Sequence, residues 1–262
     1  MASAPQPQLP LFYKDLMPLN SRDHANWRAR TVDKATWLGN QHAIPLTVEE
    51  FPLAQRTFPI VFSAGDNSVP LALMGLNEGI NVFFEDDGTP RGDAYVPAYI
   101  RRYPFLLAKL RPDAEEMSLC FDPTTDLIGE FEDGQALFTD GQPSEHTKSL
   151  LQFCENFEQA GARTQAFMEE LKKNDLLMDG EVSIARNDQP DQPYVYRGFK
   201  MVNQEKLKEL GAEKVKAWHD NGILPLIYAH LMSLDLMRFI FAKQAEQGKG
   251  PAAVQAEPAA VN

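Results

Sequence analysis

The fold is decided by a stretch of three apolar runs, Phe58-Pro-Ile-Val-Phe-Ser63, Val69-Pro-Leu-Ala-Leu-Met-Gly75 and Ile80-Asn-Val-Phe-Phe84. Turn residues separate them, with Gly65-Asp-Asn after the first run and Asn77-Glu-Gly79 after the second. Short apolar runs bounded by turn residues are typical of buried strands. Because the connections are too short for crossovers, the stretch predicts an antiparallel meander of three strands.

Further strands are predicted on the C-terminal side of this meander. Met117-Ser-Leu-Cys-Phe121 alternates with a period of two, which is typical of a half-buried strand. Two short runs, residues 127–131 and 135–138, flank Asp133-Gly134, a strong signal for a hairpin. We therefore expect an antiparallel sheet built mainly from residues 57–140.

Helical patterns follow from about residue 143. Between residues 143 and 174, apolar side chains recur at three- and four-residue spacing, as on one face of an amphipathic helix. Asn203 is a good N-cap for a helix over residues 204–210, and residues 223–242 form a long apolar helix. The sequence predicts an α+β fold, with an antiparallel sheet in the N-terminal half packed against long helices from the C-terminal half.

Two shorter helices are expected within the first half. Thr47-Val-Glu-Glu50 has the capping-box pattern, in which the Glu50 side chain reaches back to the start of the helix. Residues 96–104 suit a short helix, because Pro97 fits a first turn and Pro104 discourages continuation.

The two ends of the chain have compositions typical of disorder. Residues 1–10 and 244–262 are rich in Ala, Pro and Gln and carry little apolar bulk. Such segments cannot offset the entropy lost on ordering. We expect a disordered arm over residues 1–10, a single domain over residues 11–243 and a disordered tail over residues 244–262.

The charge balance restricts the partners of the protein. The chain carries 25 Lys and Arg against 37 Asp and Glu, a formal net charge of −12. Non-specific binding to nucleic acid or to an anionic membrane surface requires a cationic protein surface. We therefore expect no nucleic-acid partner.

Targeting signals and cysteine usage favour a cytoplasmic location. The first residues carry neither the cationic nor the apolar region of a signal peptide. Cys120 and Cys154 are expected to be free, buried thiols, because disulfide scaffolds are denser in cysteine. Residues 223–242 are long enough to cross a bilayer, but Asp235 and Arg238 make insertion costly, so we expect a buried core helix and no membrane span.

Few polar residues stand out as candidates for chemistry. Arg101-Arg102-Tyr103 can hold a carboxylate or phosphate, because guanidinium offers a planar fork of donors. The alternative is a structural ion pair with an acidic neighbour such as Asp86 or Asp93. His230 lies beside Tyr228 on the apolar helix, where a buried histidine bonded to a carbonyl or carboxylate is the alternative to an acid/base role.

Other patterns give no cofactor or metal. The acidic segment 85–93 lacks EF-hand spacing, so a solvated turn is expected there rather than a Ca²⁺ site. The chain has no phosphate-binding glycine motif, no HExxH spacing and no Gly-x-Ser-x-Gly elbow. We expect no metal and no cofactor.

Several strings together resemble the bacterial SapC family: Tyr99-Ile-Arg-Arg-Tyr-Pro-Phe105, Gly198-Phe199 ahead of residues 202–207, Tyr228-Ala-His-Leu-Met-Ser-Leu234, and the region of Pro18-Leu19-Asn20 and His24. The resemblance covers residues 11–242. The family takes its name from a surface-layer protein locus, and members tend to be encoded near TonB-dependent receptors and flavin-dependent halogenase-like proteins. The resemblance thus implies an accessory role in uptake or in modifying a peptide or small molecule, and it supplies no catalytic residues.

We expect a non-enzymatic binding or accessory protein of the SapC type, linked to outer-membrane uptake or surface-layer systems. It would recognise a partner protein or an acidic peptide-like ligand through residues drawn from Arg101, Arg102, Tyr103, Tyr228, His230 and His24. One alternative is an enzyme that modifies a peptide or small molecule, with His230 or His24 as acid/base and an arginine holding the substrate. That alternative requires Arg102, His230 and a carboxylate to converge in a cleft. A third is a scaffold protein with an exposed apolar patch. No ligand identity or oligomeric state follows from these patterns.

Overall fold

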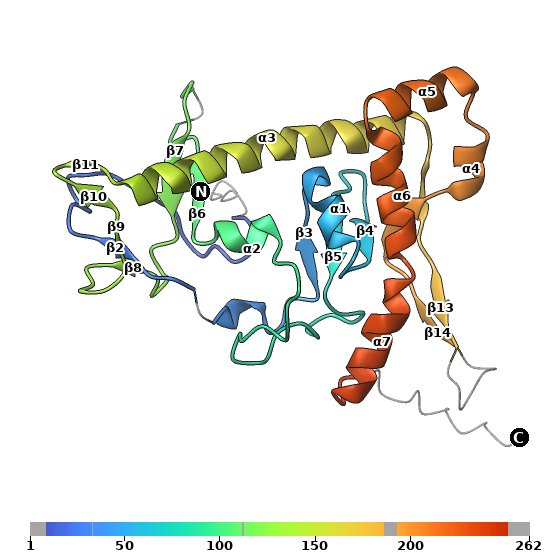
Figure 1. Cartoon of the computed structure of the whole chain (residues 1–262), viewed down its shortest axis with the longest axis horizontal. Helices are drawn as coiled ribbons and strands as arrows, with labels where there is room; N and C mark the ends of the chain where they lie inside the picture. Colours follow the sequence, from blue (N-terminus) through green and yellow to red (C-terminus); the bar gives the residue numbers. More distant parts are fainter. Residues whose placement is uncertain (1–8, 33, 112, 186–192, 251–262) are drawn as a thin grey trace, which may run out of the picture.

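A five-stranded antiparallel sheet lies at the centre of the computed structural model, which describes residues 9–32, 34–111, 113–185 and 193–250 (Figure 1). Its strand order is β12 (Leu177–Asp179), β15 (Phe199–Val202), β4 (Ile60–Ser63), β5 (Pro70–Leu73) and β3 (Ala43–Pro45). The strands β4 and β5 are the first two of the predicted meander. Two strands from the C-terminal half, β12 and β15, complete the sheet beside β4.

The third predicted strand, residues 80–84, is not a strand, and that prediction was wrong. The buried side chain of Asn81 donates to the carbonyls of Leu38 and Gln41 at 3.1 and 3.0 Å. Its amide oxygen accepts from the backbone N–H of Phe83 at 2.9 Å. These side-chain bonds hold the backbone in a turn, and β3 takes the place beside β5 instead.

The predicted hairpin around Asp133-Gly134 is also wrong in its pairing. Both of its strands, β8 (Ile128–Gly129) and β9 (Gln135–Ala136), pair with β2 (Arg28–Ala29), which lies between them. The side chain of Arg28 donates to the carbonyl of Gly134 at 2.9 Å, so the N-terminal strand is fixed to the turn itself.

The remaining strands form small sheets. A three-stranded sheet has the order β1 (Met17–Pro18), β7 (Ser118–Phe121) and β6 (Phe105–Ala108), and β7 is the strand predicted over residues 117–121. Two hairpins are formed by β10 (Phe138–Thr139) with β11 (Gln142–Pro143) and by β13 (Val182–Ile184) with β14 (Tyr194–Tyr196).

The helices follow the sequence signals more closely than the strands do. The predicted capping box of Thr47 and Glu50 is present, and Asn203 caps its helix through bonds to two backbone N–H groups. The helices are η1 (Thr36–Leu38), η2 (Val48–Glu50), α1 (Phe51–Ala54), α2 (Ala98–Arg102), α3 (Glu145–Lys173), α4 (Gln204–Lys208), α5 (Ala212–Asp220), α6 (Ile223–Ser233) and α7 (Leu236–Glu246). The α+β fold class is confirmed.

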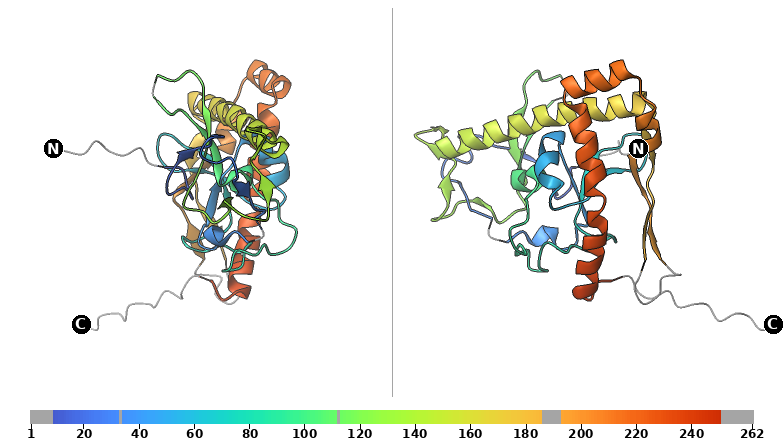
Figure 2. Two further views of the ribbon diagram at one scale, coloured as in Figure 1. Left: turned by 90° about the vertical axis from the view of Figure 1, so that its left-hand side faces the viewer. Right: turned by 45° about the vertical axis from the view of Figure 1, so that its right-hand side comes forward.

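The long helix α3 connects the two main apolar clusters. Figures 1 and 2 show it running along the molecule from the β10–β11 hairpin to α5. Near its N-terminus, the free and buried Cys154 packs in a cluster with Phe121, and Cys120 is likewise free and buried, as predicted. Near its C-terminus, Phe167 and Leu171 pack in the larger cluster over the central sheet.

The predicted long helix over residues 223–242 is interrupted where α6 meets α7. Ser233 donates to the carbonyl of His230 at 2.6 Å, which is the acceptor that the N–H of Leu234 would use in a continuous helix. The N–H of Leu234 instead bonds to the carbonyl of Leu231 at 3.4 Å. By length and composition alone, Ile223–Glu246 could cross a membrane. Only 33% of its most apolar window is buried, so this segment is less buried than the core helix that the sequence predicted.

The structure also bears on the predicted ends of the domain. The helix α7 passes the predicted domain end at residue 243, and Gln244 is buried, accepting from the N–H of Leu76 at 2.6 Å. Leu9, in the predicted arm, packs against the cluster around Tyr103. Residues 1–8 of the predicted arm and residues 251–262 of the predicted tail lie outside the described residues.

Candidate functional site

The short helix α2 carries the predicted site residues Arg101 and Arg102, with Tyr103 directly after it, and a buried carboxylate fixes its start. Glu50 accepts from the backbone N–H of Ala98 at 2.6 Å and from the hydroxyl of Tyr95 at 3.0 Å. It also accepts from the N–H of Thr47 at 2.8 Å. Because buried carboxylates are costly unless hydrogen-bonded, this set of bonds ties α2 firmly to the capping box of η2.

Arg102 points inward from α2, into an aromatic cage. Its guanidinium carbon lies 4.3 Å from the ring centroid of Phe157, 5.0 Å from that of Tyr99 and 5.8 Å from that of Tyr13. Its side chain is 6% exposed, and Nη1 lies 3.3 Å from a carboxylate oxygen of Glu158. Its buried Nε has no hydrogen-bond partner among the described residues. The buried charge of Arg102 is therefore only partly compensated.

The two tyrosines of the cage keep their protons. The hydroxyl of Tyr13 donates to the carbonyl of Phe105 at 2.7 Å, and that of Tyr99 donates to the carbonyl of Leu11 at 3.2 Å. Burial raises the pKa of both phenols, although the neighbouring Arg102 acts in the opposite direction. The cage thus surrounds the guanidinium with rings and neutral hydroxyl groups.

Arg101 points outward beside the same helix. Its Nε donates to the carbonyl of Val96 at 3.1 Å, and its guanidinium carbon lies 5.3 Å from the ring centroid of Phe153. Phe153 and Phe157 are one turn apart on α3, so both arginines lie along one face of that helix. Within the described part of the chain, Arg101 forms no ion pair with a carboxylate.

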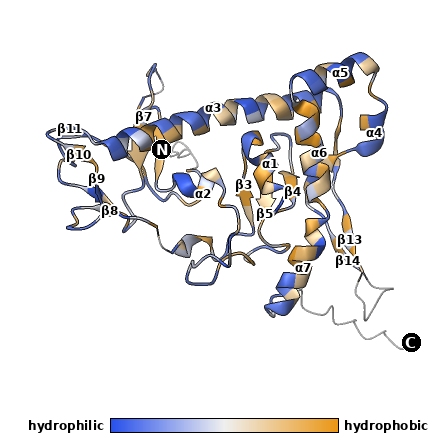
Figure 3. Cartoon of the chain, viewed as in Figure 1, coloured by the Kyte–Doolittle hydropathy of each residue, from blue (hydrophilic) through white to orange (hydrophobic). Residues whose placement is uncertain are grey.

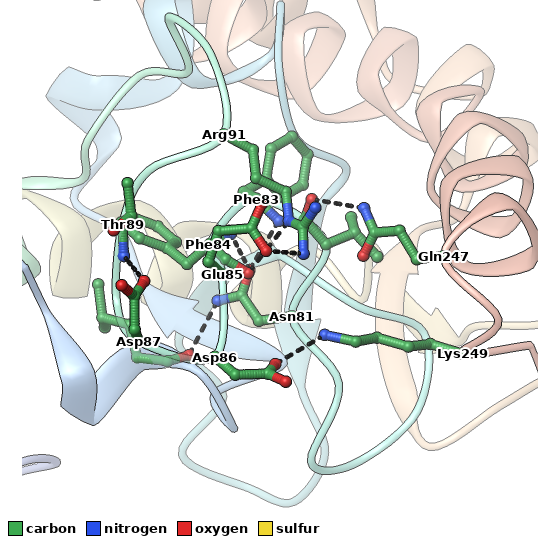
Figure 4. A network of polar contacts seen from close by, with 12 residues as sticks. Asn81, Phe83, Phe84, Glu85, Asp86, Asp87, Thr89, Arg91, Gln247 and Lys249 are labelled. Atoms are coloured by element: carbon green, nitrogen blue, oxygen red, sulfur yellow. Dashed lines mark hydrogen bonds and ion pairs between the residues drawn. The ribbon is translucent and has the colours of Figure 1, made fainter.

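The alternative of a structural ion pair with an acidic neighbour matches Arg102, but its partner is Glu158 and not Asp86 or Asp93. Asp86 instead pairs with Lys249 at 3.1 Å, as Figure 4 shows. No signal in the sequence identified the partner, since Glu158 is one of many acidic residues on the polar side of α3.

Tyr103 is buried against a second group of rings. Its ring centroid lies 4.6 Å from that of Trp37, 5.2 Å from that of Tyr13 and 6.1 Å from that of Phe12. Tyr13 is therefore both a member of the cage around Arg102 and a neighbour of Tyr103. The indole N–H of Trp37 is buried with no partner among the described residues, and sequence reasoning did not select this tryptophan.

In the described residues, His24 and Tyr228 make no contact with the arginines. His24 is buried; its Nδ1 accepts from the N–H of Asn20 at 3.1 Å, and its ring contacts those of Trp27 and Phe121 at 4.5 and 5.3 Å. It closes a turn in the N-terminal segment. Tyr228 is exposed on α6.

His230 is fully buried, and both of its ring nitrogens bond to backbone groups. Nδ1 lies 2.7 Å from the carbonyl oxygen of Ile60, and Nε2 accepts from the N–H of Val202 at 3.1 Å. The imidazole stacks on Phe62 at 4.6 Å. Desolvation lowers the pKa of His230 to about 4, so it is neutral at physiological pH. These contacts match the structural alternative, a buried histidine bonded to a carbonyl.

The structure does not bring Arg102 and His230 together. Arg102 packs on Phe157, whereas His230 stacks on Phe62, which contacts Phe167 at 6.4 Å. Ten residues of α3 separate the two phenylalanines, a rise of about 15 Å. The residues that do come together are Arg101, Arg102 and Tyr103 with the aromatic rings around them.

The acidic loop after residue 84 is a turn whose carboxylates pair with cations (Figure 4). Glu85 pairs with Arg91, Asp87 pairs with Lys34, and the N–H of Gly88 donates to the carbonyl of Glu85 at 2.9 Å. The described residues contain no group of three His, Cys, Asp or Glu side chains that could hold a metal ion.

Comparison with known proteins yields one match. The model of a protein family described as SapC matches residues 19–239, which is most of the chain. No curated protein matches, and no solved structure matches. The matched segment contains α2, α3 and α6, and with them both arginines and the cage residues Tyr99 and Phe157, whereas Tyr13 precedes it.

Proposed function

The chain belongs to the SapC family, and from this membership and the geometry of α2 we propose that it is a non-enzymatic binding or accessory protein. Its ligand is an acidic peptide-like molecule or an acidic segment of a partner protein. One observation carries the proposal: two adjacent arginines lie on one face of α3, one open to solvent and one buried without full compensation.

Arg101 supplies the first point of attachment. Its Nε donates to the carbonyl of Val96 and its guanidinium also interacts with the hydroxyl of Tyr95, but the side chain is exposed and pairs with no carboxylate in the described residues, so a ligand carboxylate can reach it. Guanidinium binds carboxylate through two parallel charge-assisted bonds. The ring of Phe153 lies beside the guanidinium and offers an apolar surface to the stem of a ligand's acidic side chain.

Arg102 supplies the second point of attachment. In the free protein its partner is Glu158, whose side chain is 38% exposed, so the position of this carboxylate is reached from solvent. A carboxylate of the ligand can take that position while Glu158 turns to water. The exchange adds no uncompensated charge, because one carboxylate replaces another beside the buried guanidinium.

The setting of this recognition is proposed from the family and the thiols. We place the protein in the cytoplasm, where its two free thiols stay reduced, as an accessory to outer-membrane uptake or surface-layer systems. In the described residues, His24 and His230 have bonds to backbone groups, and no contact joins either ring to the arginines. Binding is therefore proposed in preference to the alternative of an enzyme.

Arrays of acidic peptides test the proposal directly. Peptides rich in Asp and Glu should bind the wild-type chain, and their Asn and Gln counterparts should not. Arg101→Glu should weaken binding about tenfold or more, whereas Glu158→Gln should strengthen it by removing the internal competitor.

Arg111→Glu is the matched control, because Arg111 is an exposed arginine on the loop after β6 and pairs loosely with Asp113. It should bind as the wild type does. Equal binding of acidic and amide peptides, or equal losses for Arg101→Glu and Arg111→Glu, would contradict the proposal.

A further inference from the structure

The last two helices present an apolar stripe to solvent. Tyr228, Met232 and Phe239 are 48%, 69% and 46% exposed. Because Leu234 and Asp235, between the two helices, keep right-handed helical backbone angles, the spacing of four and seven residues places the three side chains on one face of the α6–α7 segment. Exposed Pro225 and Ala242 extend this face at its two ends. We call these five residues the C-terminal stripe. Figure 3 shows hydrophobic residues along both helices.

The opposite face of the same helices is buried. Ile227, Met237 and Ile240 pack in the main apolar cluster, and His230 bonds to the central sheet. A helix that is apolar on all sides is normally surrounded by protein. Here the stripe stays uncovered in the single chain, and contiguous exposed apolar residues of this kind mark contact surfaces.

Two exposed charges lie at the middle of the stripe. Asp235 and Arg238 are three residues apart, and neither forms an ion pair with the part of the chain that the structure describes. A face with one free charge of each sign is complementary to itself under a two-fold axis, since each charge meets its opposite on the other copy.

We propose that the C-terminal stripe is the interface of a homodimer in which the α6–α7 segments of two copies pack antiparallel. If Met232 lies against Phe239 of the second copy, then Asp235 lies within two residues of Arg238 of the second copy. Two residues correspond to about 3 Å along the axis, within reach of an arginine side chain. The symmetry repeats both contacts.

The same register explains the position of Lys243. It places Lys243 opposite Tyr228 of the second copy, where an ammonium group and an aromatic ring attract each other. Lys243 already lies over aromatic rings in the single chain, 4.9 Å from the ring centroid of Phe239. Apolar, cationic and aromatic groups therefore all find suitable neighbours in this one arrangement.

A second copy fits the stripe better than a bilayer does. Insertion into lipid would bury Asp235 and Arg238 in an apolar medium, which is unfavourable. In the dimer they pair across the axis at its centre. The proposal does not depend on ligand recognition by the arginines of α2, and either can fail alone.

Sedimentation analysis of the full chain from about 1 to about 100 μM tests the proposal. The wild type should be a dimer at the upper end of this range. Met232→Glu should be a monomer with an unchanged far-ultraviolet circular dichroism spectrum, because the replaced side chain is exposed. Leu110→Glu, which alters an exposed apolar side chain after β6 and away from these helices, should remain a dimer.

Charge reversal distinguishes a self-complementary interface from other occupants. Asp235→Arg and Arg238→Asp should each be monomeric, because each places like charges opposite each other. Mixed together, they should form a one-to-one heterodimer. The proposal would be overturned if the wild type stayed monomeric throughout, or if the Met232→Glu variant dimerised as the wild type does. Flotation of the wild type as a monomer with phosphatidylcholine–phosphatidylglycerol vesicles would also overturn it.

Discussion

Nδ1 of His230 lies 2.7 Å from the carbonyl oxygen of Ile60, and this contact fastens α6 to the central sheet. The hydroxyl of Ser233, on the same helix, accepts from the N–H of Ile60 at 2.8 Å. Nε2 of His230 accepts from the N–H of Val202 on the neighbouring strand at 3.1 Å. Side chains of α6 thus satisfy backbone groups that would otherwise be left unpaired in the core.

Removal of the His230 side chain should destabilise the fold. His230→Ala leaves the carbonyl of Ile60 and the N–H of Val202 without partners and opens a cavity beside Phe62. We expect the free energy of unfolding, measured in urea, to fall by about 3–5 kcal/mol. His230→Gln should lose less, because an amide can both donate and accept.

The control for this prediction is His219→Ala, since His219 is an exposed histidine on α5. It should change the free energy of unfolding by less than about 0.5 kcal/mol. Equal losses for the two alanine variants would show that the bonds of His230 contribute nothing special to stability.

The stability of the fold should also decrease as the pH is lowered, because His230 is buried in its neutral form. Burial lowers the pKa of His230 to about 4 in the folded chain, from about 6.5 in the unfolded chain. Between these two pKa values, the unfolded state binds more protons than the folded state. The contribution of neutral, buried His230 to stability is therefore present above about pH 6.5 and is lost as the pH falls toward about 4. The full loss is about 3 kcal/mol.

Urea titrations at about pH 7 and about pH 5 measure this loss. The wild type should lose more stability across this interval than His230→Gln, which has no imidazole to protonate. Carboxylates with lowered pKa values, such as Asp87 and Asp133, titrate below this interval and are shared by both proteins. Parallel pH profiles for the two chains would refute the assignment.

Local sequence signals predicted most of the helices. The capping box of Thr47 and Glu50 and the N-cap of Asn203 depend on bonds within a few residues, so short patterns suffice to identify them. The divergence of Arg101 and Arg102, one exposed and one buried, follows from their adjacent positions on a helix. That these arginines bind a ligand stays a prediction.

Long-range pairing was beyond these signals. The turn at Asp133-Gly134 looks like a hairpin because nothing nearby shows that β2 will enter between its strands from about a hundred residues earlier. Asn81 likewise reads as part of a strand until its bonds to Leu38 and Gln41 are known. The cage around Arg102 draws Tyr13 and Phe157 from distant segments for the same reason.

Glu50 should control the order of α2. Glu50→Ala removes the acceptor for the N–H of Ala98 and the hydroxyl of Tyr95. We expect the free energy of unfolding to fall by about 2–4 kcal/mol. Hydrogen exchange of the Ala98 amide should become faster than that of amides in the middle of α3.

Glu49→Gln is the matched control, because the neighbouring Glu49 is exposed and pairs with Arg163 at the surface. Surface pairs of this kind contribute about 0–1 kcal/mol, so the exchange rate at Ala98 should not change. If Glu50→Ala leaves that rate unchanged as well, the carboxylate does not fix α2.

Arg102 should be more important for binding than for stability. Arg102→Met keeps an unbranched apolar stem within the aromatic rings and removes a charge with one partner at 3.3 Å. Replacing a buried ion pair by an apolar side chain is often neutral or stabilising, so we expect the free energy of unfolding to stay within about 1 kcal/mol of the wild type or to rise. Binding of acidic peptides should fall.

Removal of the partner carboxylate should have the opposite effect on stability. Glu158→Ala leaves the guanidinium of Arg102 buried without a carboxylate, which we expect to cost about 1–2 kcal/mol, since Glu158 is partly exposed and its pair is screened. Glu155→Ala, an exposed position on the same helix, should be neutral. In the double variant Arg102→Met and Glu158→Ala, the loss should disappear, because no unpaired charge remains; a loss that persists would mean that Glu158 stabilises α3 independently of Arg102.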